Sequence, residues 1–421
     1  MKVFKFGGAS VNTVDRIKNV AGILRSIGEE KILIVISAIG KTTNALESVA
    51  EAFYAGKKEE ALQLFDQVKR SHVNTLDELL VINHKKAIEE LSVFFTEIEW
   101  LLHDKPVRDY DYYYDQIVCI GELLSTSLIS SYLKEVNIKN TWIDVRDIFR
   151  TDDNFRDANI DLAITGKKID EIILPLFSKE NFMITQGFIG ATDENESTTL
   201  GREGSDYTAA LFANLLDAES LTIWKDVEGI MNADPKEFAD AKFLKQLSYN
   251  EVIEMAYYGA QVIHPKTIKP LQNKNIPLYV SCFLNPQSQG TVITKKNVSA
   301  LPPIIVIKKE QVLMRFNSKD FSFVGEKPVS VLYEIFAKQN TRPNLTQNGA
   351  ISLLCCMDDV PDKIEKLALS ASDIFDVQLE KDLTLLTIRH YTKDIIDELI
   401  DKNKVVLEQK TNETIQVLMK K

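Results

Sequence analysis

The sequence predicts an α/β domain with a mainly parallel central sheet, followed by two smaller α+β units. The run ILIVISA, residues 32–38, is apolar without alternation, which is typical of a strand buried on both faces of a parallel sheet. Further strand candidates at 141–145, 181–190 and 220–226 are separated by stretches with helical periodicity. After about residue 300 the elements become shorter and change their order, which indicates a domain boundary.

The first element is a strand-like run that carries Lys5 directly before Gly7 and Gly8. An unpaired buried ammonium is strongly disfavoured, so Lys5 is expected to face a partner or a ligand. The glycines allow a sharp turn close to a bulky group, and helical periodicity follows from Val14 to Ile27. Together these features form a candidate anion site, although the Walker and dinucleotide spacings are absent. A tight turn with a surface lysine is the alternative on this stretch alone.

Residues 45 to about 103 are expected to be almost entirely helical, and the chain then returns to alternating helices and strands. In a parallel sheet, ligands bind beyond the carboxyl ends of the strands. The polar and glycine residues at those ends are therefore the first candidates for a site: Lys5, Gly7, Gly8, Ser37, Gln186, Gly187, Lys225 and Asp226.

The richest stretch is TLGREGSDYTAALFANLL, residues 199–216. Ser205 or Asp206 suits the cap of the helix that follows, which would explain both residues structurally. A cap does not explain Arg202, whose guanidinium fork before a helix N-terminus is well suited to a substrate carboxylate. Asp206 could hold an ammonium, so the stretch suits an amino-acid ligand.

Three other features are ambiguous locally. Glu122, after the apolar QIVCI, is slightly better explained as a solvated helix residue. The loop at 224–235 could bind a divalent cation or edge a nucleotide, but it lacks the EF-hand spacing of acids. His264, before Pro265, is expected to be a turn or core histidine, because no nucleophile motif accompanies it.

The C-terminal part shows a β-α-β-β order twice. We expect one domain over residues 1–300, an α+β unit over 301–380, and a second unit over 381–421 that ends before its last helix and strand.

Composition excludes several function classes. The net charge of −11 argues against nucleic-acid binding and against docking on anionic lipid. We expect no signal peptide and no membrane span, because no apolar run approaches 18 residues. The four cysteines show no metal-ligand spacing, which suits reduced thiols in the cytoplasm.

The order of the motifs is more specific than any one of them. KFGGAS, SAIGKTTN, ITQGFIG, GREGSDYTAA, WKDVEGIMNADP and YGAQVIHPKT follow one another, and the chain resembles the aspartate kinases of the amino-acid kinase superfamily. The resemblance covers about residues 1–300 and extends to a tandem ACT regulatory tail. It implies a three-layer αβα kinase domain followed by ferredoxin-like ACT domains. It also implies phosphorylation of the side-chain carboxylate of L-aspartate by ATP with Mg²⁺, in an ACT-paired homodimer.

The resemblance assigns roles residue by residue. It makes Lys5 and Asp206 catalytic. It places the substrate at Ser37, Thr43, Glu122, Phe188, Arg202 and Ser205. It places the nucleotide at Gly7, Gly8, Lys225, Asp226, Gly229, Met231, Lys236 and Gln261, and it leaves the metal ligands unknown.

This chain departs from the family pattern mainly in the nucleotide region. Gln261 replaces a lysine that binds phosphate in many members, and Lys225 and Met231 stand where threonine and tyrosine are common. Glu203 replaces a glycine, and Ala9 a threonine. These changes bear on ATP affinity more than on substrate identity.

Two rival functions remain open at this point. Another amino-acid kinase could act on glutamate, N-acetylglutamate or UMP, but Glu122 and Asp206 suit a free ammonium that N-acetylglutamate lacks. A catalytically idle amino-acid sensor would use only the tail, which the intact Lys5 and Arg202 disfavour.

The tail raises an expectation about its effector. In lysine-sensitive relatives an acid-rich turn helps to capture lysine, but the matching residues 343–350 contain no carboxylate. Asn344 and Ala350 stand where aspartate and glutamate are common. An amide gives no charge attraction to an ammonium, so weak or absent inhibition by lysine is expected.

Overall fold

The computed structural model describes residues 1–320 and 322–421, and these divide into two compact units. Both units are made of segments that are discontinuous in the sequence. The first comprises Met1–Ile230, Leu244–Ile253 and Ile263–Val298, and the second comprises Met231–Phe243, Glu254–Val262 and Ser299–Lys421. The division at about residues 300 and 380 that the sequence predicts stays a prediction.

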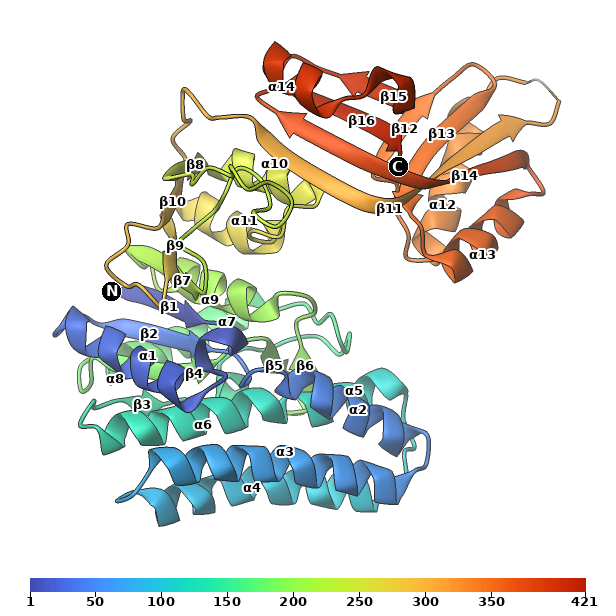
Figure 1. The fold of residues 1–421 in the computed structure, drawn as a ribbon. Coiled ribbons are helices and arrows are strands. Elements are labelled where there is room, and N and C mark those ends of the chain that lie inside the picture. The colour runs from blue at the N-terminus through green and yellow to red at the C-terminus, as the bar shows by residue number, and fades with distance from the viewer. Residues whose placement is uncertain (321) are drawn as a thin grey trace. The chain divides into compact units, whose positions relative to one another are not determined.

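The first unit is built on a sheet in the order β3-β4-β2-β1-β7-β9-β10-β8, in which only the β9–β10 pair is antiparallel among the described strands. The mainly parallel sheet is therefore confirmed (Figure 1). Its strands are β1 (Lys2–Phe6), β2 (Ile32–Ile36), β3 (Thr141–Trp142), β4 (Phe182–Gln186), β7 (Ser220–Lys225), β8 (Gln246–Ser248), β9 (Leu278–Cys282) and β10 (Thr291–Thr294). A separate hairpin pairs β5 (Ile189–Ala191) with β6 (Ser197–Thr199).

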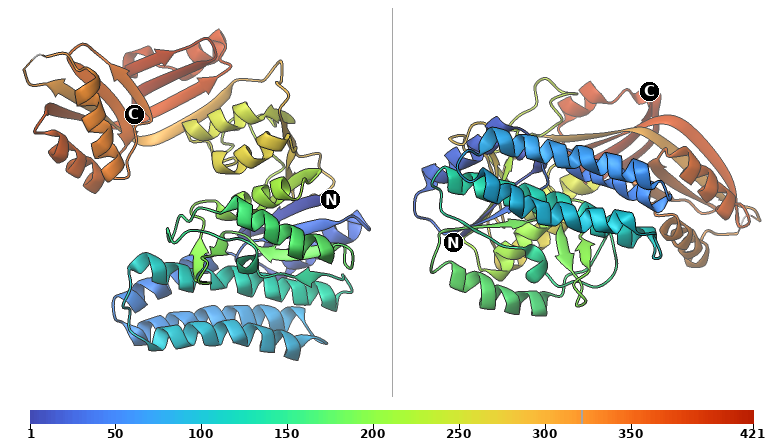
Figure 2. Two further views of the ribbon diagram at one scale, coloured as in Figure 1. Left: turned by 180° about the vertical axis from the view of Figure 1, so that it is seen from behind. Right: turned by 90° about the horizontal axis from the view of Figure 1, so that it is seen from below.

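The helices cover the sheet in layers. Helix α6 contacts β2, β3 and β4, whereas α9 contacts β1, β2 and β7. The pair α3 and α4 lies on the far side of α6 from the sheet (Figures 1 and 2). Together with α2, this pair confirms that residues 45–103 are almost entirely helical. The helices of this unit are α1 (Val14–Ile27), α2 (Thr42–Tyr54), α3 (Lys58–Leu79), α4 (His84–His103), α5 (Tyr110–Val118), α6 (Ile120–Glu135), α7 (Leu162–Lys168), α8 (Leu174–Leu176), α9 (Gly204–Leu215), α10 (Tyr249–Tyr258) and α11 (Pro265–Lys274).

Two expected strands are shorter than the sequence predicts. The stretch 141–145 forms a strand only at Thr141–Trp142, because the Asp144 carboxylate accepts a hydrogen bond from the Arg146 N–H and starts a 3₁₀ turn instead. The stretch 181–190 is broken between β4 and β5. There Phe188 has a φ of 70°, which is incompatible with a continuous strand.

Helix α6 is buried on all sides rather than on one face. With α5 it forms the stretch Tyr110–Glu135, which is long and apolar enough to cross a membrane by length and composition. In this protein 94% of the most apolar 18-residue segment of this stretch is buried inside the fold, as is expected of a core helix. The helix thus carries Glu122 into the interior, and the local interpretation of Glu122 as a solvated residue is wrong.

The second unit contains a sheet in the order β12-β13-β11-β14-β16-β15, antiparallel throughout its described pairs. This sheet and its helices fit the predicted ACT-like fold. The elements are β11 (Ile304–Ser318), α12 (Glu326–Lys338), β12 (Leu345–Asn348), β13 (Ser352–Asp358), α13 (Pro361–Ala371), β14 (Phe375–Arg389), α14 (Lys393–Leu399), β15 (Val405–Lys410) and β16 (Thr414–Lys420).

Strands β11 and β14 run through both halves of this sheet. Residues 311–318 of β11 pair with β13 and with the first part of β14, whereas residues 304–308 pair only with the last part of β14. One apolar cluster joins α12 and α13 to the first half, and another joins α14 to the second half. The two halves therefore share their central strands.

Candidate active site

The residues that follow the parallel strands meet at one pocket of about 470 Å³, a volume that suits a small ligand. Lys5 comes from β1, Ser37 follows β2 and Phe188 follows β4. These three strands are neighbours and run in the same direction, so their carboxyl ends lie side by side. The opposite wall is the N-terminal turn of α9.

All eight residues predicted as catalytic or substrate-binding line this pocket, together with one predicted nucleotide residue. They are Lys5, Ser37, Thr43, Glu122, Phe188, Arg202, Ser205 and Asp206, joined by Gly8. Motif reasoning missed the other lining residues: Ala38, Gly40, Tyr114, Arg156, Thr199, Gly201, Glu203 and Gly204. Several of these flank predicted residues, but Tyr114 and Arg156 belong to no motif that the sequence displays.

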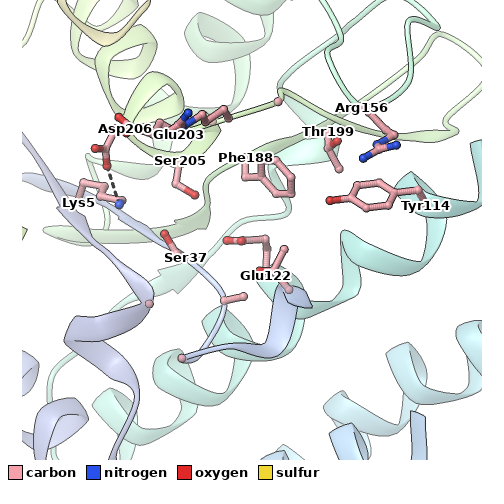
Figure 3. A pocket seen from close by; sticks show the side chains of 17 residues that line it. Lys5, Ser37, Tyr114, Glu122, Arg156, Phe188, Thr199, Glu203, Ser205 and Asp206 are labelled. Atoms are coloured by element: carbon pink, nitrogen blue, oxygen red, sulfur yellow. Dashed lines mark ion pairs between the residues drawn. The ribbon is translucent and has the colours of Figure 1, made fainter. Parts of the chain in front are cut away.

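The ion pair of Lys5 with Asp206 lies at one end of the pocket (Figure 3). Lys5 Nζ is 2.6 Å from Asp206 Oδ1, and the two side chains are only 11% and 7% exposed. Burial acts to raise the pKa of Asp206, but the Lys5 and Lys225 charges outweigh it and hold the pKa below its usual range. The buried lysine thus has the partner that the sequence requires, and it lines the pocket.

Glu122 lies in the first turn of α6 and is 3% exposed. Burial raises the pKa of this carboxyl to about 8, against the opposing effects of a hydrogen bond from the Ala38 backbone and of the Lys5 charge. Its Oε2 atom is buried without a hydrogen-bond partner among the described residues. A buried acceptor of this kind is costly unless a ligand completes it, and a substrate ammonium would do so.

The turn after β1 comes within contact of the turn after β2. A Cβ atom added to Gly8 would lie 2.7 Å from the Ala38 carbonyl oxygen, so only glycine fits at this approach. The Gly40 N–H donates to the Gly8 carbonyl at 3.2 Å and ties the two turns together. Gly8, Gly40 and the first turn of α9 line the pocket together, and a helix N-terminus favours an anion.

The loop before α9 places Arg202 and Glu203 at the rim, where both are exposed. Glu203 has a φ of 55°, a conformation that favours glycine, which agrees with the family's glycine at this position. Its carboxylate accepts a hydrogen bond from the His264 N–H at 3.1 Å. His264 itself caps α11 by accepting from the Lys266 N–H, so its expected role in a turn is confirmed.

The remaining predicted nucleotide residues do not line this pocket. Gly7 lies beside Lys5, and Lys225, Asp226 and Gly229 lie at or after the end of β7 in the first unit. Met231, Lys236 and Gln261 belong to the second unit. Their assignment to an ATP site stays a prediction. Among the described residues, no group of three or more His, Cys, Asp or Glu could hold a metal ion.

Comparisons with known proteins agree with the geometry. The model of the amino acid kinase family matches residues 1–282. The lysine-sensitive aspartokinase 3 of Escherichia coli K12 is 31% identical over 400 residues, which cover 92% of this chain and 86% of that protein. The chloroplastic aspartokinase 2 of Arabidopsis thaliana is 32% identical over 394 residues, covering 87% and 71% respectively.

Solved structures give the same result. The E. coli aspartokinase III in complex with lysine and aspartate is similar over all of this chain and 96% of its own, with a TM-score of 0.83 and 28% identity. The same enzyme in complex with aspartate and ADP gives a TM-score of 0.82 over the same coverage.

Proposed function

The chain belongs to the aspartokinases of the amino acid kinase family, and from this premise we propose how its residues perform the reaction. The enzyme uses ATP to phosphorylate the side-chain carboxylate of L-aspartate to 4-phospho-L-aspartate, the first step towards lysine, threonine and methionine. The observation that carries the residue assignment is the convergence of Lys5, Asp206, Glu122 and Arg202 on one pocket.

The acceptor needs no general base, because the β-carboxylate of aspartate is already ionised near pH 7. Catalysis therefore depends on position and on charge. Lys5, held by Asp206, faces the transferring phosphoryl group and stabilises the charge on its equatorial oxygens. The backbone N–H of Gly8 and the positive end of the α9 helix dipole act on the same oxygens.

The other groups of the pocket hold the amino acid. Arg202 binds the carboxylate that is not phosphorylated, through a fork of parallel hydrogen bonds. Glu122 receives the ammonium, which supplies the partner that its Oε2 atom lacks. Ser37, Thr43, Phe188 and Ser205 complete the walls.

We propose that magnesium binds to this protein together with ATP, and not as an ion held by the protein alone. Mg²⁺ commonly binds through substrate phosphates, water and one or two carboxylates. Asp206 is the buried carboxylate next to Lys5 and is the residue that we assign to such an ion's surroundings. The ion would neutralise phosphate charge there.

The second unit is proposed to bind an amino-acid effector weakly. The Asn344 side chain is already engaged within the fold, because it accepts from Lys308 Nζ at 2.6 Å and donates to Gln311 and Asp358 at 2.8 Å. A lysine ligand at this amide would have to approach next to the Lys308 ammonium, whose like charge disfavours it. The open edges of β12 and β15 suit pairing with a second copy, which supports a homodimer.

A cytoplasmic setting is proposed from the thiols. Cys119, Cys282, Cys355 and Cys356 are all free and buried. Burial raises the pKa of the Cys119, Cys355 and Cys356 thiols to about 12, which keeps them protonated and unreactive. A reducing compartment fits such a set.

An ADP-release assay over a panel of acceptors tests the proposal. We expect turnover with L-aspartate and none above background with L-glutamate, N-acetylglutamate or UMP, and we expect Lys5→Ala to remove the signal. Turnover that survives in Lys5→Ala would refute the residue assignment. A folded protein that releases no ADP with any acceptor but binds amino acids would instead indicate a sensor.

A further inference from the structure

Tyr114 and Arg156 form the end of the pocket opposite Lys5 and Asp206 (Figure 3). Tyr114 comes from α5, and Arg156 comes from the loop between β3 and α7. The site proposed above leaves both residues without a role. The chemistry of this end therefore requires an explanation.

The backbone of Arg156 is held in a conformation that favours glycine. Its φ is 70°, and its N–H donates to Asp115 Oδ2 at 3.0 Å. Asp115 is fully buried, and its carboxylate also accepts from the Thr199 N–H at 2.8 Å and from the Thr199 hydroxyl at 2.7 Å. Backbone strain of this kind costs on the order of 1–3 kcal/mol and clusters at functional sites, so it points to a functional role for this loop.

The guanidinium of Arg156 is oriented by two further contacts. Its Cζ atom lies 4.4 Å from the centre of the Tyr114 ring, and Nη1 pairs with Asp111 Oδ1 at 3.1 Å. The side chain is 43% exposed, so it remains accessible to a ligand. Asp111 engages one of the five N–H donors of the guanidinium, which leaves donors to meet a carboxylate.

The loop of Arg156 packs directly against the loop of Arg202. A Cβ atom on Gly201 would lie 3.2 Å from the Arg156 carbonyl oxygen, and the Ala158 N–H donates to the Thr199 carbonyl at 3.0 Å. Asp115 thus fixes both loops through Arg156 and Thr199. The two arginines start from adjacent backbone segments and line the same pocket.

We propose that Arg156 is a specificity-determining residue that binds the non-reacting carboxylate of the acceptor together with Arg202. The inference rests on the aspartate site proposed above. Arg156 lies at the end of the pocket opposite Lys5, and Arg202 lines the same pocket, so these residues together suit an acceptor that carries two carboxylates. An amino acid with a single carboxylate satisfies only one of these ends.

The experiment compares two matched variants, Arg156→Gln and Arg108→Gln. Arg108 is also stacked on a tyrosine, with its Cζ 3.6 Å from the Tyr112 ring centre, and it is also paired with a carboxylate, that of Glu196. It does not line the pocket. We expect Arg156→Gln to raise the KM for L-aspartate about 10-fold with the KM for ATP unchanged, as the loss of a charged hydrogen bond predicts. Arg108→Gln should change neither constant.

Arg156→Gly separates this role from a structural one. Glycine relieves the left-handed strain, so its urea midpoint should equal or exceed that of the wild type while its KM for aspartate rises. A lower urea midpoint combined with higher KM values for both aspartate and ATP would show that Arg156 only supports the loop. An unchanged KM for aspartate in Arg156→Gln would overturn the proposal outright.

A substrate analogue identifies the group that Arg156 touches. L-Aspartic acid α-amide keeps the reacting carboxylate but has a neutral amide in place of the other one. The preference of the wild type for aspartate over this amide, measured by kcat/KM, should shrink about 10-fold in Arg156→Gln. An undiminished preference would refute the contact.

A failure of the proposed function can be told apart from a failure of this inference. If the wild type released no ADP with any acceptor, the proposed function would fail. The role of Arg156 would then be tested by calorimetry, in which the Kd of L-aspartate must rise in Arg156→Gln.

Discussion

Replacing Glu122 with glutamine removes a titration that lowers the stability of this protein near neutral pH. Glu122 is 3% exposed, and burial raises its pKa from 4.5 to about 8 despite the Ala38 N–H and the Lys5 charge. In the unfolded chain the same carboxyl ionises near its ordinary pKa. Between these two values the folded protein holds a proton that the unfolded chain has released.

The sign and size of the effect follow from this difference. Because the folded state binds more protons, the free energy of unfolding falls as the pH rises, by about 1.4 kcal/mol per unit between the two pKa values. Integrated from about pH 5.5 to about pH 7.5 with those values, the loss is about 2.5 kcal/mol. Glutamine cannot titrate, so the variant should lack this part of the pH dependence.

Urea unfolding at the two pH values measures the effect, with tryptophan fluorescence as the signal. Trp100, Trp142 and Trp224 all belong to the first unit, so the signal reports the unit that contains Glu122. Burial also raises the pKa of Asp115, to about 6, but this group titrates in both proteins and cancels in the comparison. If the free energy of unfolding depended on pH equally in the wild type and in Glu122→Gln, the inference that Glu122 is buried and protonated would be refuted.

The same carboxyl should make aspartate binding depend on pH. A substrate ammonium favours the ionised form of Glu122, so binding is coupled to release of its proton. The KM for aspartate should therefore fall as the pH rises from about 7 to about 8.5 in the wild type. Steady-state kinetics of Glu122→Gln should show a higher KM that no longer changes over this range.

Three further predictions concern the pocket and the second unit. Lys5→Ala should lower kcat by on the order of 100- to 1000-fold, since one preorganised charge contact is lost, and it should also lower the urea midpoint, because the buried Asp206 carboxylate loses its partner; near-normal kcat would contradict the assignment of Lys5. Arg202→Lys should raise the KM for aspartate much more than the KM for ATP, because an ammonium cannot form the two parallel bonds of a guanidinium; a selective change in the ATP constant would move Arg202 to the nucleotide site. L-Lysine titrated into initial-rate assays should inhibit weakly or not at all, with L-threonine as the comparison, because Lys308 already occupies the Asn344 amide; strong inhibition below the millimolar range would show that the missing carboxylates do not matter.

Much of the fold and of the pocket could be predicted, because the signals are local. The run at 32–38 gave a central strand as expected, and the residues after β1, β2 and β4 meet because parallel strands end at one edge. Lys5 was recognisable as a paired or ligand-facing charge from its apolar neighbours alone. The structure adds the identity of its partner, Asp206, which lies far away in the sequence.

Other parts of the site depend on packing that no short stretch encodes. The burial of Glu122 comes from the surroundings of α6, which is enclosed on all sides, whereas the local stretch alone favoured a solvated helix residue. Arg156 reaches the pocket because Asp115 fixes its loop. A polar loop followed by a helix gives no sign of that contact. A residue outside a motif but inside the site was therefore out of reach of sequence reasoning.

The shared strands of the second unit have a consequence for how this part of the chain is made. Ile304 lies opposite Arg389, so the first residues of β11 leave the ribosome long before their partner exists. The half that contains α14 cannot close until β14 is complete, and its high contact order implies slow, late folding. Because the same two strands cross both halves, melting of one half removes hydrogen-bond partners from the other. The two halves should therefore exchange their amide protons as a single cooperative foldon.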